Sequence, residues 1–235
     1  MTDLSGKIAL ITGASKGIGA AVAIAYAQAG AHVILLARNE RKLTKIDDKI
    51  KKIGGKATLI PCDLNDHDAL KNLAPLLQER FGKLDIFVGN AGVLGTLSPL
   101  QDTSVREFNQ VMNVNLTTNF ILLKTLHPLL KQSDSGRVIL VSTAEDVVKG
   151  SAYWGSYAIS KSALETMARV YAEENKQSNI RINLLDPVKV RTDMRVKAKP
   201  GEDPMSLKTP EDITGSFLML ASNDCIHHGE VIKAQ

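Results

Sequence analysis

The chain has 235 residues, an apolar content of 44% and a net charge of +4, with charges of both signs spread along it. This length is enough for one core and short for two, and the composition excludes a disordered chain, so we expect one domain spanning residues 1–235. The modest charge, the scarcity of aromatics and the lack of an apolar run of ~20 residues argue against nucleic acid and membrane as partners.

Compartment and metal binding are also constrained. The N-terminal residues enter a strand-like run at once, so we expect no signal peptide. Cys62 and Cys225 lie far apart and match no metal or redox spacing, which favours structural thiols in a reducing compartment. The histidines show no metal-binding spacing with a carboxylate, so we assign no metal. We therefore expect a cytoplasmic protein.

Short apolar runs alternate with amphipathic segments along the whole chain. The apolar runs predict strands at residues 7–12, 31–37, 57–61, 84–88, 137–141, 180–185 and 230–233. The segments between them predict helices at 18–29, 40–53, 66–81, 105–130, 152–176 and 211–220. Strict alternation implies right-handed crossovers and a mostly parallel sheet covered on both faces. We predict an α/β fold with a Rossmann-type, doubly wound sheet of about seven strands.

A glycine-rich turn follows the first predicted strand and opens the first helix. Its sequence is Thr12-Gly13-Ala14-Ser15-Lys16-Gly17-Ile18-Gly19. Gly13 suits a tight turn, Gly17 lets the backbone approach a pyrophosphate, and Gly19 lets helix and strand pack closely. The helix N-terminus offers free N–H groups and a positive dipole end. This position in the first strand–helix unit predicts a dinucleotide-binding loop rather than a purely structural turn.

The end of the second strand indicates which dinucleotide is bound. An acid there would bond the ribose 2′-hydroxyl of NAD(H), whereas a basic residue accommodates the 2′-phosphate of NADP(H). The strand ends Leu36-Ala37-Arg38-Asn39, and Lys16 lies in the glycine loop. Two cations without a carboxylate favour NADP(H) over NAD(H). The alternative is that Arg38 is only a solvated charge after a strand.

Tyr157 and Lys161 lie four residues apart on a predicted helix, so their side chains share a face. A free phenol titrates near pH ~10, which is too high for efficient acid–base catalysis near neutrality. A positive charge at ~4 Å is worth about 4 kcal/mol at an effective dielectric of ~20, or roughly three pKa units. Upstream, Ser142 and Thr143 end the fifth strand and supply a hydroxyl that suits a substrate carbonyl oxygen.

Taken together, these motifs resemble the short-chain dehydrogenase/reductase family over essentially the whole chain. The resemblance implies hydride transfer at the nicotinamide, with Tyr157 exchanging a proton with the substrate oxygen. Lys161 would hold the ribose and lower the tyrosine pKa, and Asn115 would position a water. The implied catalytic residues are Asn115, Ser142, Thr143, Tyr157 and Lys161; the implied cofactor-binding residues are Gly13, Ser15, Lys16, Gly17, Ile18, Gly19, Arg38, Asp63, Leu64, Asn90, Ala91, Gly92, Tyr157, Lys161, Pro187, Val188 and Thr192.

The chain departs from the family pattern at several positions. Thr143 aligns with the catalytic serine and Ser142 precedes it, and either hydroxyl suits the role, with Thr143 favoured. Glu145 stands where a small apolar residue is commoner, and Val188 replaces the glycine that usually follows Pro187. Loss of this glycine affects how the backbone passes the nicotinamide. The family's usual C-terminal glycine pair is absent as well.

Residues 193–209 are the expected substrate lid. The lid carries Arg195, Lys197 and Lys199 beside two methionines, which suits an acyl thioester and resembles 3-oxoacyl-(acyl-carrier-protein) reductases. Ordinary solvated side chains explain these cations equally well. We expect the substrate pocket to be lined by four residues, namely Val93, Leu94, Tyr153 and Trp154.

The main hypothesis is an NADP(H)-dependent carbonyl reductase or alcohol dehydrogenase. One alternative is a regulator that binds dinucleotide without turnover, which the changes at Glu145 and Val188 would fit. Another is a relative that catalyses epimerisation or dehydration, although such proteins usually have a longer substrate domain. The resemblance also implies a homodimer or homotetramer.

Overall fold

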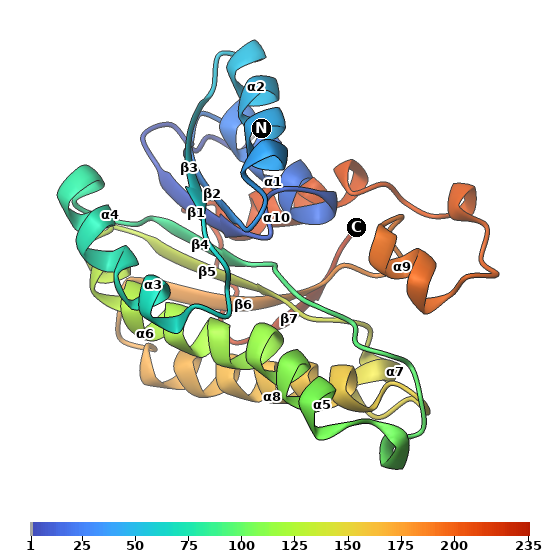
Figure 1. The fold of residues 1–235 in the computed structure, drawn as a ribbon. Coiled ribbons are helices and arrows are strands. Elements are labelled where there is room, and N and C mark those ends of the chain that lie inside the picture. Colours follow the sequence, from blue (N-terminus) through green and yellow to red (C-terminus); the bar gives the residue numbers. More distant parts are fainter. Residues whose placement is uncertain (1) are drawn as a thin grey trace.

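The computed structural model describes residues 2–235 and holds one seven-stranded sheet (Figure 1). All neighbouring strands pair in parallel, in the order β3-β2-β1-β4-β5-β6-β7. This arrangement confirms the predicted doubly wound α/β fold, in which the strand order reverses between β1 and β4. The strands are β1 Ile8–Thr12, β2 His32–Ala37, β3 Lys56–Pro61, β4 Ile86–Gly89, β5 Gly136–Val141, β6 Ile180–Asp186 and β7 Val231–Lys233.

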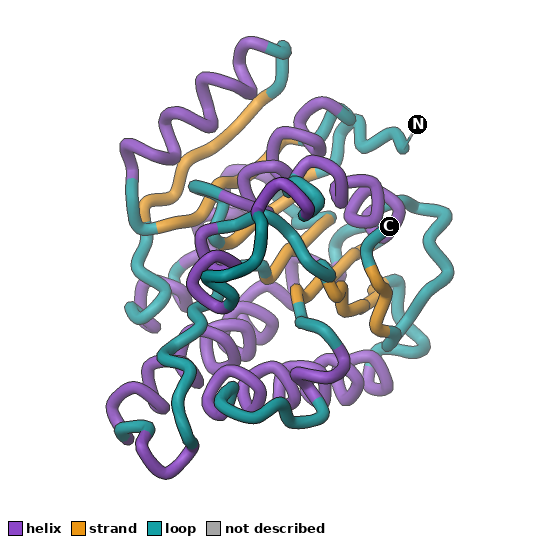
Figure 2. Tube along the Cα trace, turned by 90° about the vertical axis from the view of Figure 1, so that its right-hand side faces the viewer, coloured by secondary structure: helices purple, strands orange, loops and turns teal. Residues whose placement is uncertain are grey.

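Helices cover both faces of the sheet (Figures 1 and 2). One face is covered by α1 Gly17–Gln28, α2 Glu40–Lys52 and α10 Thr214–Ala221. The other face is covered by α3 His67–Lys71, α4 Leu73–Phe81, α6 Thr118–Lys131 and α8 Gly155–Glu174. α5 Val105–Met112 packs against α8, while the short helices α7 Glu145–Val148 and α9 Asp193–Ala198 lie beyond the carboxyl ends of the strands.

The predicted helix at 66–81 is divided in two at Asn72. Asp66 caps α3 by accepting a hydrogen bond from Ala69 N at 3.0 Å. Pro75 lies in the first turn of α4, where its missing N–H leaves the carbonyl four residues earlier without a helical partner. The ladder is therefore interrupted at this point, and a new helix begins at Leu73.

The predicted helix at 105–130 contains an irregular turn. α5 continues into a π-helical segment, Asn113–Thr117, and then into α6. Such π turns occur frequently at functional sites. Asn115, a candidate catalytic residue, lies within this turn and is fully buried.

The predicted helix at 152–176 begins later than expected, at Gly155. Tyr153 has φ +72°, a left-handed conformation that is incompatible with a helix interior. Within residues 2–235, four short elements lie outside the predicted helices, namely α7, α9 and the 3-10 turns Leu100–Asp102 and Pro204–Ser206. The predicted helix at 211–220 is present, but its first residues, Glu211–Ile213, form a 3-10 turn before α10.

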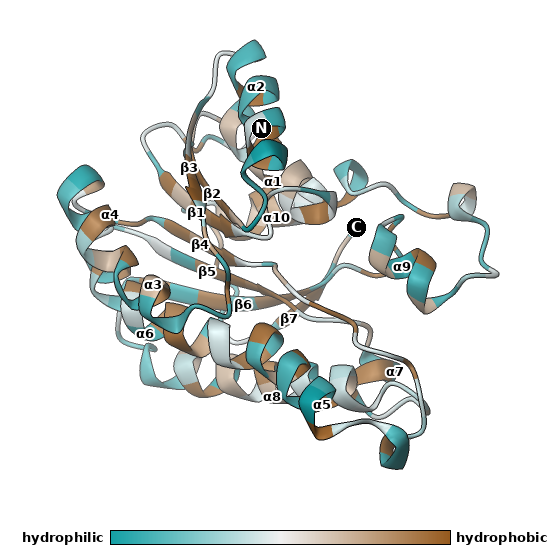
Figure 3. Cartoon of the chain, in the orientation of Figure 1, coloured by the Kyte–Doolittle hydropathy of each residue, from teal (hydrophilic) through white to brown (hydrophobic). Residues whose placement is uncertain are grey.

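Apolar side chains concentrate in the strands and on the inner faces of the helices. Figure 3 shows the strands as mostly hydrophobic and the outer surface of α2 as hydrophilic. β2 alone buries Val33, Ile34, Leu35 and Leu36 completely. A strand buried on both faces is expected in a parallel sheet with two helical layers.

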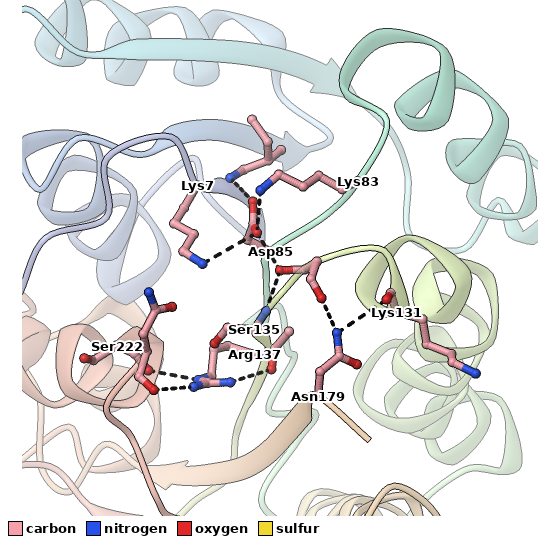
Figure 4. A network of polar contacts seen from close by, with 12 residues as sticks. Lys7, Lys83, Asp85, Lys131, Ser135, Arg137, Asn179 and Ser222 are labelled. Carbon is pink, nitrogen blue, oxygen red and sulfur yellow. Dashed lines mark hydrogen bonds and ion pairs between the residues drawn. The ribbon is translucent and has the colours of Figure 1, made fainter. Parts of the chain in front are cut away.

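A polar network ties the amino ends of the central strands together (Figure 4). Asp85, which is fully buried before β4, accepts hydrogen bonds from Ile8 N at 2.9 Å and Lys83 Nζ at 3.0 Å. Arg137 of β5 donates through Nε to Ser222 O at 2.9 Å. These charges lie at the edge opposite the candidate site, so we assign them a structural role.

Candidate active site

The predicted site residues gather at the carboxyl edge of the sheet. Each of the first six strands ends in a loop that carries at least one of them. The loops contribute Gly13 after β1, Arg38 after β2, Asp63 after β3, Asn90 after β4, Thr143 after β5 and Val188 after β6. In an open parallel sheet, this edge at the β1–β4 switch point is where ligands bind.

Close approach to Asn90 explains two of the glycines. A Cβ on Gly19 would lie 2.5 Å from Asn90 Nδ2 and 2.5 Å from Gly13 O. A Cβ on Gly13 would lie 2.9 Å from the same amide nitrogen, and Gly13 also has φ +67°. The Asn90 amide fills this space and donates to Thr12 O at 2.9 Å. The loops after β1 and β4 therefore pack as one unit.

Thr12 joins these two loops through its buried hydroxyl. Thr12 Oγ1 accepts hydrogen bonds from Asn90 N and Ala91 N, both at 3.0 Å, and donates to Val88 O at 3.3 Å. A valine here would keep the shape but leave two backbone donors without their partner. This residue fixes the floor of the site.

The start of α1 is arranged to receive an anion. Gly17 has φ +55°, and a Cβ there would make only an ordinary contact with Thr192, so its conformation rather than space requires glycine. Lys16 is the N-cap residue, but its side chain bonds Asp193 Oδ2 at 2.6 Å instead of the helix. The first-turn N–H groups of this 12-residue helix are thus left for another acceptor.

The loops after β2 and β3 carry an exposed cation beside an ordered carboxylate. Arg38 is exposed, and Asn39 caps α2 by accepting from Lys42 N at 2.9 Å. Asp63 Oδ1 accepts from Asn65 N at 3.0 Å, which lowers the pKa of the Asp63 carboxyl, and nearby Arg38 adds to this effect. The following residue, Leu64, is buried, and its carbonyl accepts from Thr118 Oγ1 at 3.0 Å.

Tyr157 and Lys161 lie on the same face of α8, as their spacing predicted. Lys161 Nζ is 5.8 Å from the centroid of the Tyr157 ring, and the two side chains are buried. Burial raises the pKa of Tyr157 to about 12, against the lowering effect of the Thr143 hydroxyl. The expected depression of the phenol pKa by Lys161 is therefore wrong for this structure, because burial sets the direction of the shift and Lys161 is not among its causes.

Lys161 is held by a backbone carbonyl at the end of β5. Its ammonium donates to Val141 O at 2.6 Å. Burial lowers the pKa of Lys161 to about 8, while the carboxylate of Glu165 acts in the opposite direction. Lys161 is thus a buried cation with a fixed direction rather than a mobile surface lysine.

Ser142 and Thr143 have different partners. Ser142 Oγ donates to Glu165 Oε1 at 2.7 Å, and the other oxygen of this buried carboxylate accepts from Arg169 at 2.8 Å. The Thr143 hydroxyl instead lies close enough to the Tyr157 phenol to lower its pKa. The geometry therefore favours Thr143 as the hydroxyl that meets a substrate, and it assigns Ser142 to the support of β5.

Asn115 connects the π turn to the loop after β4. Its amide accepts from Val93 N at 2.8 Å and donates to Val93 O at 3.0 Å and to Ser160 Oγ at 2.9 Å. Ser160 in turn donates to Tyr157 O at 2.7 Å. The backbone carbonyl of Asn115 accepts a hydrogen bond from the side-chain amide of Asn119 at 2.8 Å. Asn115 thus links the loop carrying Gly92 to the helix carrying Tyr157.

The backbone after β6 keeps a glycine-like conformation without a glycine. Val188 has φ +54°, which is an outlier for a β-branched residue. Its N–H donates to Asp186 Oδ1 at 2.8 Å, and burial raises the pKa of this carboxyl. Further on, Thr192 caps α9 by accepting from Arg195 N at 3.2 Å. The chain therefore follows the expected path despite the substitution.

Glu145, the other unusual residue, lies outside the buried part of the site. It begins α7 and pairs with Lys149 at 2.6 Å, with both side chains largely exposed. An exposed pair of this kind contributes little to stability. The substitution leaves the surroundings of Tyr157 intact.

An apolar cluster forms one wall beside Tyr157. Trp154 packs with its ring centroid 5.8 Å from that of Tyr157, and Leu94 is buried in the same cluster. Tyr153 is instead 62% exposed, and Val93 bonds Asn115 through its backbone N–H and carbonyl. The cluster joins the loop after β4, both helices α7 and α8, and the lid; its members are Leu94, Leu97, Ala144, Val147, Trp154, Tyr157, Ala158, Met194 and Ala198.

One of the three predicted lid cations is already paired. Arg195 donates through Nε to Glu202 at 2.5 Å and through a second nitrogen at 2.7 Å. This bidentate pair closes the lid segment on itself. Arg195 is therefore a poor candidate for holding a substrate phosphate. Within residues 2–235, neither Lys197 nor Lys199 forms an ion pair of this kind.

Three residues around this site were not predicted from the sequence. Glu165 lies four residues after Lys161, so helical spacing alone gave a signal for it. Ser160 and Asp193 each neighbour a predicted site residue, but only the fold shows their partners. Within residues 2–235, the structure holds no cluster of three metal-ligating side chains and no helix long and apolar enough to cross a membrane.

Comparison with known proteins gives consistent similarities. A family model described as short chain dehydrogenase matches residues 7–203. The uncharacterised oxidoreductase YciK of Escherichia coli K12 is 39% identical over 227 residues, or 94% of this chain and 88% of the relative. Versicolorin reductase stcU of Emericella nidulans is 37% identical over 192 residues, or 81% and 72%. The structure of a Shigella flexneri short chain dehydrogenase complexed with NADP has a TM-score of 0.95 at 38% identity and covers 100% of both chains.

Proposed function

Because this chain belongs to the short-chain dehydrogenase/reductase family of oxidoreductases, we propose that it uses NADP(H) to interconvert a carbonyl and a hydroxyl group on a small apolar substrate. The observation that carries the proposal is the convergence of Thr143, Tyr157 and Lys161 at the carboxyl edge of the sheet, beside the open N-terminus of α1. A purely structural arrangement would not require a buried lysine next to a buried phenol.

The residues at the first turn fit a dinucleotide. The N–H groups that open α1 suit its phosphates, and glycine at position 17 lets that backbone approach them. Lys16 and Arg38 are exposed cations on neighbouring loops, which suits the additional phosphate of NADP(H). The NADP complex of the similar Shigella flexneri protein supports the same choice.

When bound, NADPH supplies the hydride. Tyr157 donates a proton to the substrate oxygen in the reducing direction, and its raised pKa keeps the phenol protonated at neutral pH. The Thr143 hydroxyl, which lies near the Tyr157 phenol, donates to the same oxygen and stabilises its developing charge. Lys161, fixed on Val141 O, lies next to the phenol and favours its ionised form when the proton leaves.

The substrate is proposed to bind against the apolar cluster around Trp154. This wall includes Met194 and Ala198 of the lid, so residues 193–209 would cover the substrate. A 3-oxoacyl thioester remains one candidate, with Lys197 and Lys199 available for a carrier phosphate. The bidentate pairing of Arg195 with Glu202 removes one cation from that argument, so simple apolar ketones are candidates of equal standing.

A side-by-side fluorescence titration with NADPH and NADH tests the cofactor, and a panel of apolar ketones and 3-oxoacyl thioesters then tests the reaction. Tighter binding of NADPH and turnover of at least one carbonyl are expected. Binding of neither dinucleotide would overturn the proposal. Tight NADPH binding with an inert panel would instead favour a regulatory protein that has retained the fold without turnover.

We also propose that two copies pair through α6 and α8. Phe120 on α6 is 55% exposed and Val170 on α8 is 52% exposed, although both are apolar. Large apolar side chains exposed on adjacent helices are typical of an association surface. Light scattering should show a dimer or tetramer, and Phe120→Asp should shift it toward monomer; an unchanged mass for the variant would place the interface elsewhere.

A further inference from the structure

An ion pair links the glycine loop to the lid. Lys16 Nζ lies 2.6 Å from Asp193 Oδ2, although the two residues are 177 positions apart in the sequence. Lys16 precedes α1, and Asp193 is the first residue of α9. Behind them, the methyl group of Thr192 lies 3.6 Å from the place of a Cβ on Gly17. The two segments thus meet directly over the start of α1.

The Asp193 carboxylate lies among cations from several elements. Lys16, Lys42 of α2 and Lys197 of α9 all lower the pKa of Asp193. Lys42 belongs to the first turn of α2, the helix that follows Arg38 in the chain. Asp193 therefore places a negative charge in the region that would receive the 2′-phosphate of NADP(H).

Stability alone does not account for this pair. The two side chains are 61% and 73% exposed, and exposed ion pairs contribute little to folding. An acid at the first position of α9 is favourable with or without Lys16. What requires explanation is the choice of Lys16 as partner, since this lysine is the cation of the glycine loop.

We propose that Asp193 is a specificity-determining residue that occupies Lys16 in the cofactor-free protein and is displaced by the 2′-phosphate of NADP(H). This inference rests on the proposed function. NAD(H) carries a hydroxyl at that position and leaves the pair intact, whereas the 2′-phosphate of NADP(H) takes over Lys16 and must break its pair with Asp193. Asp193 therefore weakens the binding of NADP(H) but not that of NAD(H). Because Asp193 belongs to the lid, binding of a 2′-phosphate also releases the contact between the lid and the glycine loop.

A double-mutant cycle on the full-length protein tests the proposal. Dissociation constants for NADPH and NADH are measured by fluorescence for the wild type, Asp193→Asn, Lys16→Met and the double variant, at low and equal ionic strength. Asp193→Asn should tighten NADPH binding about fivefold, equivalent to about 1 kcal/mol, and change NADH binding less than twofold. In the Lys16→Met background, the same change should move NADPH binding less than twofold, because the partner is already absent.

Asp224→Asn is the matched control. It makes the same change in net charge on the loop whose carbonyls bind Arg137, at the amino end of β5 and away from the site. It should alter neither dissociation constant. Equal tightening of NADPH and NADH by Asp193→Asn, or an undiminished effect without Lys16, would overturn the inference while leaving the NADPH preference of the wild type in place. Failure of the wild type to bind either dinucleotide would overturn the inference together with the proposed function.

Discussion

Ser142 Oγ donates a 2.7 Å hydrogen bond to Glu165, and Lys161, one turn earlier on α8, donates at 2.6 Å to the carbonyl of the preceding residue, Val141. One face of α8 therefore holds two consecutive residues at the end of β5. This attachment positions Thr143, the next residue, against Tyr157. The neighbouring hydroxyls of Ser142 and Thr143 thus differ in role because they differ in partner.

Exchange of each hydroxyl should separate these roles. Thr143→Val should lower kcat at least ~100-fold, because a donor to the developing oxyanion is lost. Ser142→Ala should lower the free energy of unfolding by about 1–2 kcal/mol because Glu165 Oε1 loses its partner, with a much smaller fall in kcat. Steady-state kinetics on a carbonyl substrate and urea unfolding measure both effects. Thr143→Ser, which retains the hydroxyl, should keep most activity; inactivation by Ser142→Ala with an active Thr143→Val would reverse the assignment.

Removing the phenolic hydroxyl tests the proton donor. Tyr157→Phe should lower kcat by about 10²–10⁴-fold, because the substrate oxygen loses its proton source. The NADPH dissociation constant should stay within about threefold, since the ring still packs against Trp154. Kinetics and fluorescence titration of the same preparation give both values. A variant that keeps most of its turnover would remove Tyr157 from the mechanism.

Reversing the charge of Arg38 tests cofactor choice on the β2 side. Arg38→Asp should weaken NADPH binding at least tenfold and shift the preference toward NADH, because an acid at this position pairs with a ribose hydroxyl and repels a phosphate. Lys52→Asp, at the far end of α2, makes the same charge change and should leave the ratio of the two dissociation constants unaltered. An unchanged ratio in Arg38→Asp would show that this residue is only a solvated charge.

In the strained turn after β6, glycine should be more stable than alanine, which reverses the usual order of these two residues. Val188 has φ +54°, where any residue with a Cβ is disfavoured by roughly 1–2 kcal/mol. Val188→Gly should therefore be more stable than Val188→Ala by about 1 kcal/mol, although alanine normally stabilises relative to glycine. At the exposed neighbour Lys189, Lys189→Ala should be more stable than Lys189→Gly. Thermal unfolding gives the comparison, and an alanine advantage at both positions would argue against strain at Val188.

The sequence pattern was sufficient to predict the sheet and the edge at which the site forms. Alternation of apolar and amphipathic segments restricts the topology, and loops after parallel strands then meet at one edge. That is why Gly13, Arg38 and Thr143, although distant in sequence, were predicted to lie around one site.

The partners of individual side chains were less accessible from the sequence. The pairing of Ser142 with Glu165 depends on how α8 is rotated against β5, and that of Lys16 with Asp193 depends on where the lid lies. The pKa of Tyr157 was misjudged for a related reason. The four-residue spacing indicated that the charge of Lys161 lies nearby. The pKa of Tyr157 is instead governed by burial, which only the packed structure reveals.

Burial of Lys161 should make stability depend on pH in a definite direction. Burial lowers the pKa of Lys161 to about 8, below the value of 10.5 for an unperturbed lysine. Between these two pH values the unfolded chain binds more protons, so raising the pH stabilises the fold. From pH 7 to pH 9.5, the free energy of unfolding of the wild type should rise by about 2 kcal/mol relative to Lys161→Met. Urea unfolding at both pH values measures this difference. Parallel pH profiles for the wild type and Lys161→Met would mean that the native ammonium keeps its ordinary pKa, through solvent access or a closer approach of Glu165.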